Sequence, residues 1–340
     1  MGVSGDLNSV ARAMVAPGKG ILAADESSPT IKKRFDSVSV ESTEENRRTY
    51  REMLFTAPGV EQYIGGVILF EETLYQSTAD GTPFPKYLAE KGIVPGIKVD
   101  KGAKPLAQFP GEKITEGLDG LRQRVGDYVE AGARFAKWRA VIDIADRIPT
   151  EFCLLANAHA LARYAALCQE AGLVPIVEPE VLMDGGHDIA RCEQVTNRTL
   201  ELTFEQLDAH RIDLTGMVLK PNMVISGKKC PRQASVEEVA AATVRCLTAH
   251  VPAAVPGIAF LSGGQSEEEA TAHLNAMNKL GPHPWELSFS YGRALQTAAL
   301  HAWAGHADKF GAGQSAFELR AKLNHLARSG QYDASMEAAA

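Results

Sequence analysis

The sequence predicts an α/β protein with a (β/α)8 or TIM barrel, and three observations lead to this fold class. Short apolar runs recur along the chain, helical segments with capping signals separate them, and nearly every run is followed by a polar residue. Eight strands alternating with helices are what a closed parallel barrel requires, because each crossover needs a helix to reach a parallel neighbour. A doubly wound open sheet is the alternative.

The expected strands are short runs rich in valine, isoleucine, leucine and phenylalanine. In chain order they are 20–24, 66–70, 96–99, 134–138, 173–177, 216–219, 257–261 and 286–289. Three intervening helices are expected to begin at capping boxes, which start at Ser42, Ser235 and Ser266. No linker or repeat divides the chain, so we expect a single domain over residues 1–340 with a mobile C-terminal tail at about 330–340.

The residues that follow the apolar runs favour the barrel over the open sheet. In chain order they are Asp25, Glu71, Asp100, Arg139, Glu178, Lys220, Ser262 and Ser290. In a barrel the carboxyl ends of all strands meet at one face, and that face carries the active site.

Composition narrows the classes of function. The chain has 340 residues, 45% hydrophobic and 23% charged, with a net charge of −7, which excludes a wholly disordered, collagenous or coiled-coil protein. The acidic balance argues against nucleic acid as the main partner. No apolar run approaches the roughly 18 to 20 residues of a membrane helix, so we expect no membrane partner. Five cysteines without a C-x-x-C pair fit a reducing, cytoplasmic compartment.

No motif indicates a metal or a cofactor. The nine histidines form neither H-E-x-x-H nor H-x-H, and no dinucleotide-binding or P-loop glycine pattern occurs. We therefore expect side chains alone to carry the chemistry.

Three lysines are unusual because each lies inside an apolar strand pattern, where lysine is rare: Lys98, Lys137 and Lys220. A lone lysine of this kind is most often a snorkelling or ion-paired surface residue, but three in corresponding positions indicate a shared role. An amine near other cations in a low-dielectric site loses its proton more easily and can form a Schiff base with a carbonyl. Lys220 is the preferred nucleophile, although periodicity alone does not decide among the three.

Schiff-base chemistry also needs acids and bases, for which Asp25, Glu178 and Glu180 are available. Glu178 and Glu180 are two residues apart, so on an extended segment they point to the same side. They can act as catalytic carboxylates or as ion-pair partners of the lysines, and the two interpretations are compatible.

Two glycine-containing loops predict phosphate binding. The segments SGGQ at 262–265 and SYGR at 290–293 follow the seventh and eighth strands, where backbone N–H groups of (β/α)8 enzymes often bind phosphate. A second phosphate could bind a cluster of hydroxyls and cations behind the first strand. That cluster consists of Ser27, Thr30, Lys33 and Arg34.

Taken together, these segments resemble the class I fructose-1,6-bisphosphate aldolases, the metal-free enzymes that form a Schiff base. The matches run from about residue 18 to about residue 303. They include GKGILAADES at 18–27, FAKWRAV at 135–141, VPIVEPE at 174–180, LKPNMV at 219–224 and SFSYGRALQ at 288–296.

The resemblance implies a lyase that cleaves fructose 1,6-bisphosphate to triose phosphates and assembles as a homotetramer. The catalytic residues it implies are Lys220, Glu178, Asp25, Glu180 and Lys137. The substrate-binding residues it implies are Ser27, Thr30, Arg34, Lys98, Arg139, Ser262, Gly263, Ser290, Gly292 and Arg293.

The C-terminus departs from the family pattern. Family members commonly end in a tyrosine that exchanges protons with the enamine, whereas this chain ends in Ala340, and Tyr332 matches the start of the family's tail. A transaldolase-like enzyme, a sugar-phosphate isomerase and a protein scaffold are the alternative functions.

Overall fold

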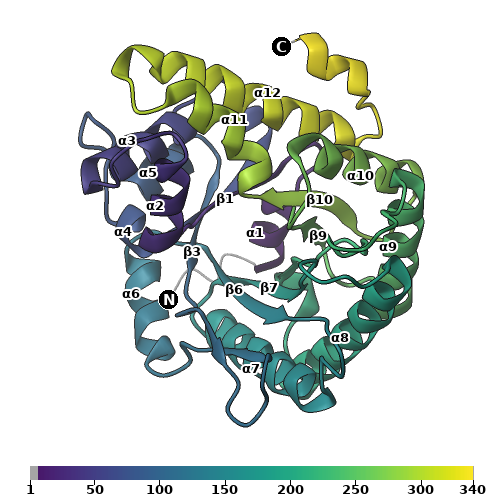
Figure 1. Ribbon diagram of the computed structural model, residues 1–340. Coiled ribbons are helices and arrows are strands. Elements are labelled where there is room, and N and C mark those ends of the chain that lie inside the picture. Colours follow the sequence, from purple (N-terminus) through teal and green to yellow (C-terminus); the bar gives the residue numbers. More distant parts are fainter. Residues whose placement is uncertain (1–6, 340) are drawn as a thin grey trace.

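The eight apolar runs form a closed barrel of parallel strands, as predicted, and helices surround it (Figure 1). The computed structural model describes residues 7–339. The barrel strands are β1 (Gly20–Ala24), β2 (Ile64–Leu69), β3 (Val94–Lys98), β6 (Phe135–Ile142), β7 (Val174–Val181), β8 (Val218–Leu219), β9 (Gly257–Phe260) and β10 (Glu286–Tyr291). They pair in the order β1, β10, β9, β8, β7, β6, β3, β2.

The helices alternate with the strands along the chain, with extra helices at both ends. They are α1 (Leu7–Met14), α2 (Ser28–Asp36), α3 (Glu44–Phe55), α4 (Glu71–Leu74), α5 (Phe84–Glu90), α6 (Leu121–Glu130), α7 (Glu151–Glu170), α8 (Ile189–Ala209), α9 (Val236–His250), α10 (Glu267–Lys279), α11 (Arg293–Trp303) and α12 (Phe310–Arg328). Short 3-10 turns lie at Val60–Gln62, Leu214–Gly216, Ala307–Lys309 and Ala334–Ala339.

Two of the three predicted capping boxes are confirmed, at Ser235 and Ser266. The third prediction is wrong in its residue: the cap of α3 is Thr43, whose hydroxyl accepts a hydrogen bond from the Asn46 amide at 3.1 Å. The carbonyl of Ser42 instead accepts a bond of 2.6 Å from Arg47, so the helix begins one residue later than expected.

Three barrel strands run past the polar residues that the sequence analysis took as strand ends. Arg139 lies within β6, Glu178 within β7 and Ser290 within β10. The sequence analysis also missed an antiparallel hairpin between β3 and β6, made of β4 (Ala103–Pro105) and β5 (Lys113–Thr115).

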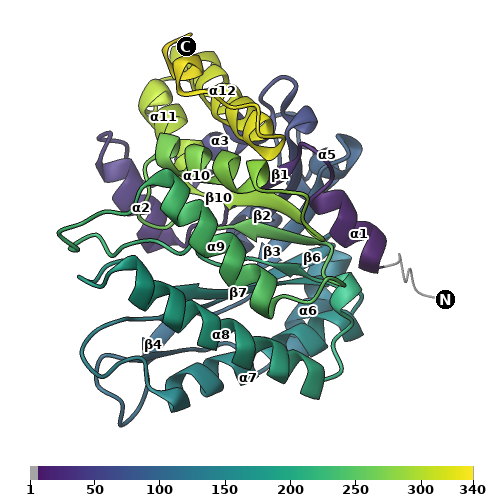
Figure 2. The same cartoon turned by 90° about the vertical axis from the view of Figure 1, so that its right-hand side faces the viewer.

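Side chains that alternate along the strands form two cores. One set faces outward and packs against the helices, for example Leu22, Trp138 and Leu219. The other set packs together with residues of α1 at the start of the strands: Ala11, Met14, Val15, Ile21, Ala23, Ile68, Phe135, Val174, Ile176, Val218 and Ala259. This inner core fills the barrel below the strand ends, and α1 covers it at one end of the barrel (Figure 2).

Parity along the strands then fixes which polar side chains lie above the inner core. Phe135 belongs to that core, and Lys137 is two residues further along β6; Val218 and Lys220 have the same relation. Because successive side chains of a strand alternate between its faces, the lysines point into the barrel like the apolar residues below them. The apolar inner core therefore lies directly beneath a layer of charged side chains.

The first and last strands of the barrel pair with each other, and α12 strengthens this seam. Ile21 of β1 is in register with Ser290 of β10. The guanidinium of Arg328, at the end of α12, donates to the carbonyls of Ala16 at 3.0 Å and Lys19, and it pairs with Glu286. The end of the chain is thus bonded to the turn that leads into β1.

None of the helices within residues 7–339 combines the length and the apolar character that crossing a membrane would require.

The packing around two glycines predicts opposite effects of a glycine-to-alanine substitution on the free energy of unfolding. A Cβ at Gly96 would overlap the ring of the buried Phe135, whereas one at Gly126 in α6 would meet no atom within 4 Å. We expect Gly96→Ala to lower the free energy of unfolding by about 2 kcal/mol through overpacking. Gly126→Ala should raise it by about 0.5 kcal/mol through helix propensity. Urea unfolding of both variants checks this. Equal changes in the free energy of unfolding would contradict the close packing of Phe135 against Gly96.

Candidate active site

A cavity of about 560 Å³ opens above the inner core at the carboxyl ends of the strands. It is lined by all the catalytic and substrate-binding residues that the family resemblance implies: Lys220, Glu178, Asp25, Glu180, Lys137, Ser27, Thr30, Arg34, Lys98, Arg139, Ser262, Gly263, Ser290, Gly292 and Arg293. These residues come from the ends of seven strands or from the segments directly after them. Closure of the barrel therefore brings them to one site, although they are far apart in sequence.

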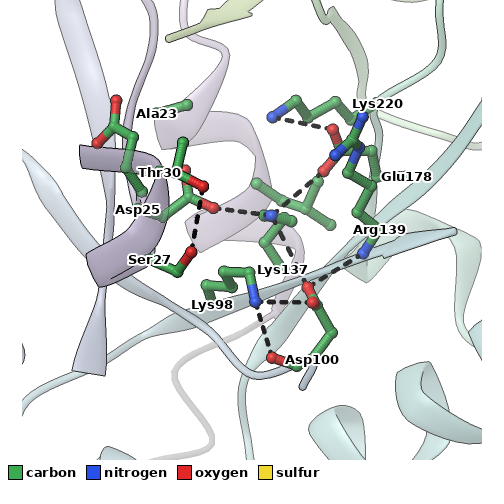
Figure 3. Close-up of polar contacts among 12 residues, drawn as sticks. Ala23, Asp25, Ser27, Thr30, Lys98, Asp100, Lys137, Arg139, Glu178 and Lys220 are labelled. Atoms are coloured by element: carbon green, nitrogen blue, oxygen red, sulfur yellow. Dashed lines mark hydrogen bonds and ion pairs between the residues drawn. The ribbon is translucent and has the colours of Figure 1, made fainter. Parts of the chain in front are cut away.

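The ammonium of Lys137 lies at the centre of the site (Figure 3). Its Nζ is 2.7 Å from a carboxylate oxygen of Asp25, 3.6 Å from one of Glu178 and 3.8 Å from one of Asp100. All four side chains are buried or nearly so, with at most 13% of their surface exposed. One cation from β6 thus compensates three carboxylates from β1, β3 and β7.

Lys220 reaches the same cluster from β8. Its Nζ lies 3.3 Å from Oε1 of Glu178, while Oε2 of Glu178 faces Lys137 (Figure 3). Glu178 therefore bridges the two lysines. The groups form a continuous row of charges from Lys220 through Glu178 and Lys137 to Asp25.

Two more ion pairs complete the charged layer. Lys98 pairs with Asp100 at 2.7 Å and donates to the carbonyl oxygen of the same residue at 2.8 Å. Arg139 pairs with the buried carboxylate of Glu180. In the strand register Lys98 is aligned with Lys137 and Arg139 with Glu178, so the charged residues of neighbouring strands lie side by side.

The environment shifts the pKa of several groups in opposite directions. Burial by itself would raise the pKa of Asp25, but the ammonium groups of Lys137, Lys220 and Lys98 lower it well below its usual range. Burial lowers the pKa of Lys137, yet the surrounding carboxylates outweigh it and raise that pKa. For Glu180, burial dominates over the attraction of Arg139 and raises the pKa. The site therefore holds an ionised Asp25 and a charged Lys137, with Glu180 more easily protonated.

One part of the cavity carries glycines, hydroxyls and an arginine, which are groups that suit a bound anion. Gly263, Gly292, Ser262, Ser290 and Arg293 line it. The hydroxyl oxygen of Ser290 is buried and has no hydrogen-bond partner among residues 7–339, which leaves it free for a ligand. Glycine at these positions lets the backbone approach a bound phosphate closely.

The second group of hydroxyls and cations is only partly assembled at the cavity. Ser27, Thr30 and Arg34 line it, and the hydroxyls of Ser27 and Thr30 are 3.2 Å apart. Lys33 does not line this cavity. It borders an adjoining cavity of about 490 Å³ between α2 and α11 instead.

Three carboxylates that line the cavity received no role from the sequence: Glu26, Glu71 and Asp100. Asp100 was named only as a strand end, yet it contacts both Lys98 and Lys137. Glu26 directly follows Asp25 and is buried. A signal existed for Asp100, because an acid at the end of a strand that carries an inward lysine is a natural partner for that lysine.

Tyr332 lies outside the cavity lining. Its ring is buried beside α10, its backbone amide donates to the Asn275 side chain at 3.0 Å, and its hydroxyl donates to Glu337 at 2.8 Å. Across residues 7–339, no group of three or more histidine, cysteine, aspartate or glutamate side chains is arranged to hold a metal ion.

The chain is similar to known proteins in family, in sequence and in structure. A family model described as fructose-bisphosphate aldolase class-I matches residues 6–340. A probable fructose-bisphosphate aldolase class 1 of Xanthomonas campestris is 60% identical over 327 residues, which cover 96% of this chain and 98% of that protein. Rat fructose-bisphosphate aldolase C is 54% identical over 332 residues, or 97% of this chain and 92% of that protein. The fructose-bisphosphate aldolase of Plasmodium falciparum, solved in complex with TRAP and a small-molecule inhibitor, superposes with a TM-score of 0.96 at 49% identity and covers 97% of this chain and 96% of that chain.

A buried histidine beside the turn at 262–265 predicts that the stability of the protein depends on pH. His273 is 7% exposed and hydrogen-bonds the side chain of Gln265 at 2.7 Å. Burial lowers its pKa from 6.5 to about 4, although Glu269 and Glu237 oppose the shift. Between these two values the unfolded chain binds more protons, so stability must fall as the pH falls.

We expect the titration of His273 to lower the free energy of unfolding by about 2 kcal/mol between pH 7 and pH 4.5. Urea unfolding of the wild type and of His273→Gln at both pH values checks the expectation. Since glutamine keeps the donor but does not titrate, the variant should lose correspondingly less stability; identical losses would rule out His273 as the source.

Proposed function

Since this chain belongs to the class I fructose-bisphosphate aldolase family, whose members are lyases, we propose that it cleaves fructose 1,6-bisphosphate reversibly to dihydroxyacetone phosphate and glyceraldehyde 3-phosphate through a Schiff base on Lys220. The observation that carries the proposal is the buried chain of Lys220, Glu178, Lys137 and Asp25. It supplies a nucleophilic amine and two carboxylates within one water-excluding site.

The partners of the three lysines support Lys220 as the nucleophile. Lys137 is held by three carboxylates, and its raised pKa keeps it charged. Lys98 is bound by both the side chain and the carbonyl of Asp100. Within residues 7–339 Lys220 has a single carboxylate within 4 Å, that of Glu178. Of the three amines it is therefore the least tightly ion-paired.

The proposed reaction begins with attack of the Lys220 amine on the C2 carbonyl. Glu178, at 3.3 Å from Nζ, takes two protons in turn from the Lys220 nitrogen, one before and one after the attack, and gives both to the C2 oxygen, which leaves as water when the iminium forms. Asp25 then removes the proton of the C4 hydroxyl, and the C3–C4 bond electrons flow into the iminium to give an enamine. Glyceraldehyde 3-phosphate leaves first. Protonation at C3 and hydrolysis of the imine then release dihydroxyacetone phosphate and restore Lys220.

The barrel order supports an assignment of the two phosphates. C1 is bonded to the carbon that Lys220 attacks, so the 1-phosphate must lie close to β8. Strand β9 is the neighbour of β8 and leads into the 262–265 loop, which makes that side of the cavity the site for the 1-phosphate. The 6-phosphate then falls to Ser27, Thr30 and Arg34 behind β1.

A homotetrameric assembly and a cytoplasmic location are further proposals that rest on the family. The five cysteines are all free, and four of them are buried, which fits a reducing compartment. Light scattering of the purified protein tests the assembly.

Borohydride trapping tests the nucleophile. Reduction in the presence of fructose 1,6-bisphosphate and a metal chelator should leave a substrate adduct on Lys220, which peptide mapping identifies. Lys220→Met should abolish the adduct and lower turnover by at least about 10⁴-fold. Lys86→Met, an exposed lysine on α5, serves as the control and should behave as the wild type. An adduct on Lys98 or Lys137 would overturn the assignment, and activity without any adduct would point to an isomerase-like mechanism.

Two carboxamide variants separate the proposed roles of the carboxylates. Asp25→Asn should form the iminium but cleave it slowly, so borohydride should trap a six-carbon bisphosphate adduct. Glu178→Gln should slow formation of the iminium and give little adduct at early times. Each should lower turnover about 10²- to 10⁴-fold. Mass spectrometry of quenched samples reads both outcomes, and a reversed pattern would exchange the two roles.

A further inference from the structure

Glu26 is a buried carboxylate at the wall of the cavity that the proposed mechanism does not use. It directly follows Asp25, and only 4% of its side chain is exposed. Burying an ionised carboxylate is costly unless its oxygens are fully paired. The side chains around Glu26 pair with both of its carboxylate oxygens.

Three helices meet at this carboxylate. Oε2 of Glu26 accepts a bond of 2.6 Å from Arg51 of α3, and Oε1 pairs with Arg34 of α2 and accepts a bond of 3.1 Å from Gln296 of α11. Gln296 is itself fixed, since it donates to the carbonyl of Ala23 at 2.7 Å and accepts from the hydroxyl of Tyr50 at 3.1 Å. The carboxylate is therefore held in one place, and two of its three partners, Arg51 and Gln296, are buried.

Arg34 is the one partner that also faces the cavity. Its side chain is 21% exposed, against 3% for Arg51. A guanidinium has five N–H donors in a planar fork, and the contact with Glu26 occupies one nitrogen. The other terminal nitrogen lies toward Gly292, 3.7 Å from the point that a Cβ of that glycine would occupy. Donors of Arg34 thus remain available inside the site.

The charges explain why a carboxylate can stand beside a phosphate site. Alone, Glu26 would repel a phosphate, but Arg34 and Arg51 lie on either side of it. The three groups together carry one net positive charge, and Arg51 contributes its charge from the protein interior. The two arginines also lower the pKa of Glu26, against the effect of burial, so the carboxylate stays ionised.

We infer that Glu26, anchored by Arg51 and Gln296, is a positioning residue that orients Arg34 toward the 6-phosphate of the substrate. This inference rests on the proposed function and on the assignment of the two phosphates. Without the carboxylate, the long side chain of Arg34 would have to be ordered by the phosphate itself, and that ordering costs binding free energy.

The test compares two substrates of one active site. Fructose 1,6-bisphosphate has the 6-phosphate and fructose 1-phosphate lacks it. For Glu26→Gln we expect kcat/KM to fall about tenfold with the bisphosphate, mainly through KM, and to change less than about twofold with the monophosphate. Glu72→Gln is the matched control: Glu72 also pairs with an arginine of α3, Arg47, but does not line the cavity. It should leave both substrates unaffected.

A double-mutant cycle separates positioning from a general structural effect. If Glu26 acts through Arg34, then Glu26→Gln should add almost nothing to the loss of kcat/KM in an Arg34→Ala background. Should Glu26→Gln fail to fold, Arg51→Lys gives a second test. It keeps the charge but loses the planar fork, so it should raise KM for the bisphosphate alone.

The outcomes distinguish this inference from the proposed function. A wild type that cleaves both sugars, with equal losses on both substrates or additive losses in the cycle, would overturn the role of Glu26 only. A wild type that cleaves neither sugar would overturn the proposed function itself. A selective, non-additive loss supports the inference.

Discussion

The active site depends on one buried cation. Lys137 compensates Asp25, Asp100 and Glu178, which come from three different strands and would otherwise place three negative charges in a cavity largely shielded from water. Without it, Asp25 would have no cation within 4 Å among residues 7–339, and Asp100 and Glu178 would each keep one, Lys98 and Lys220. Because the proposed roles of Asp25 and Glu178 require each to be ionised at some step, the fixed charge of Lys137 is a condition for both.

The sequence was sufficient to predict the barrel and many of the residues that line its cavity, and the reason is geometric. In a parallel barrel all carboxyl strand ends meet, so a polar residue after an apolar run is assigned to the site without any knowledge of contacts. The same alternation that made Lys137 and Lys220 stand out in the sequence points them into the barrel. Family resemblance then suggested a role for each residue.

The sequence was not sufficient where a residue's partners lie on distant elements. Glu26 meets Arg51 and Gln296 only because α3 and α11 pack beside each other against β1, and no local pattern encodes that contact. Strand ends were misjudged for a related reason. A polar residue was taken as the end of each apolar run, but Arg139 and Glu178 face a cavity inside the barrel, so β6 and β7 continue through them.

The seam between β1 and β10 has a consequence for synthesis of the chain. Arg328 binds the carbonyl of Ala16, 312 positions earlier, and β10 is the last strand to be made. Until β10 pairs with β1 and β9, the barrel is an open sheet with both of those edges unpaired. Such edges can join other chains. The incomplete chain is thus most exposed to aggregation before β10 takes its place, which is when a chaperone would matter most.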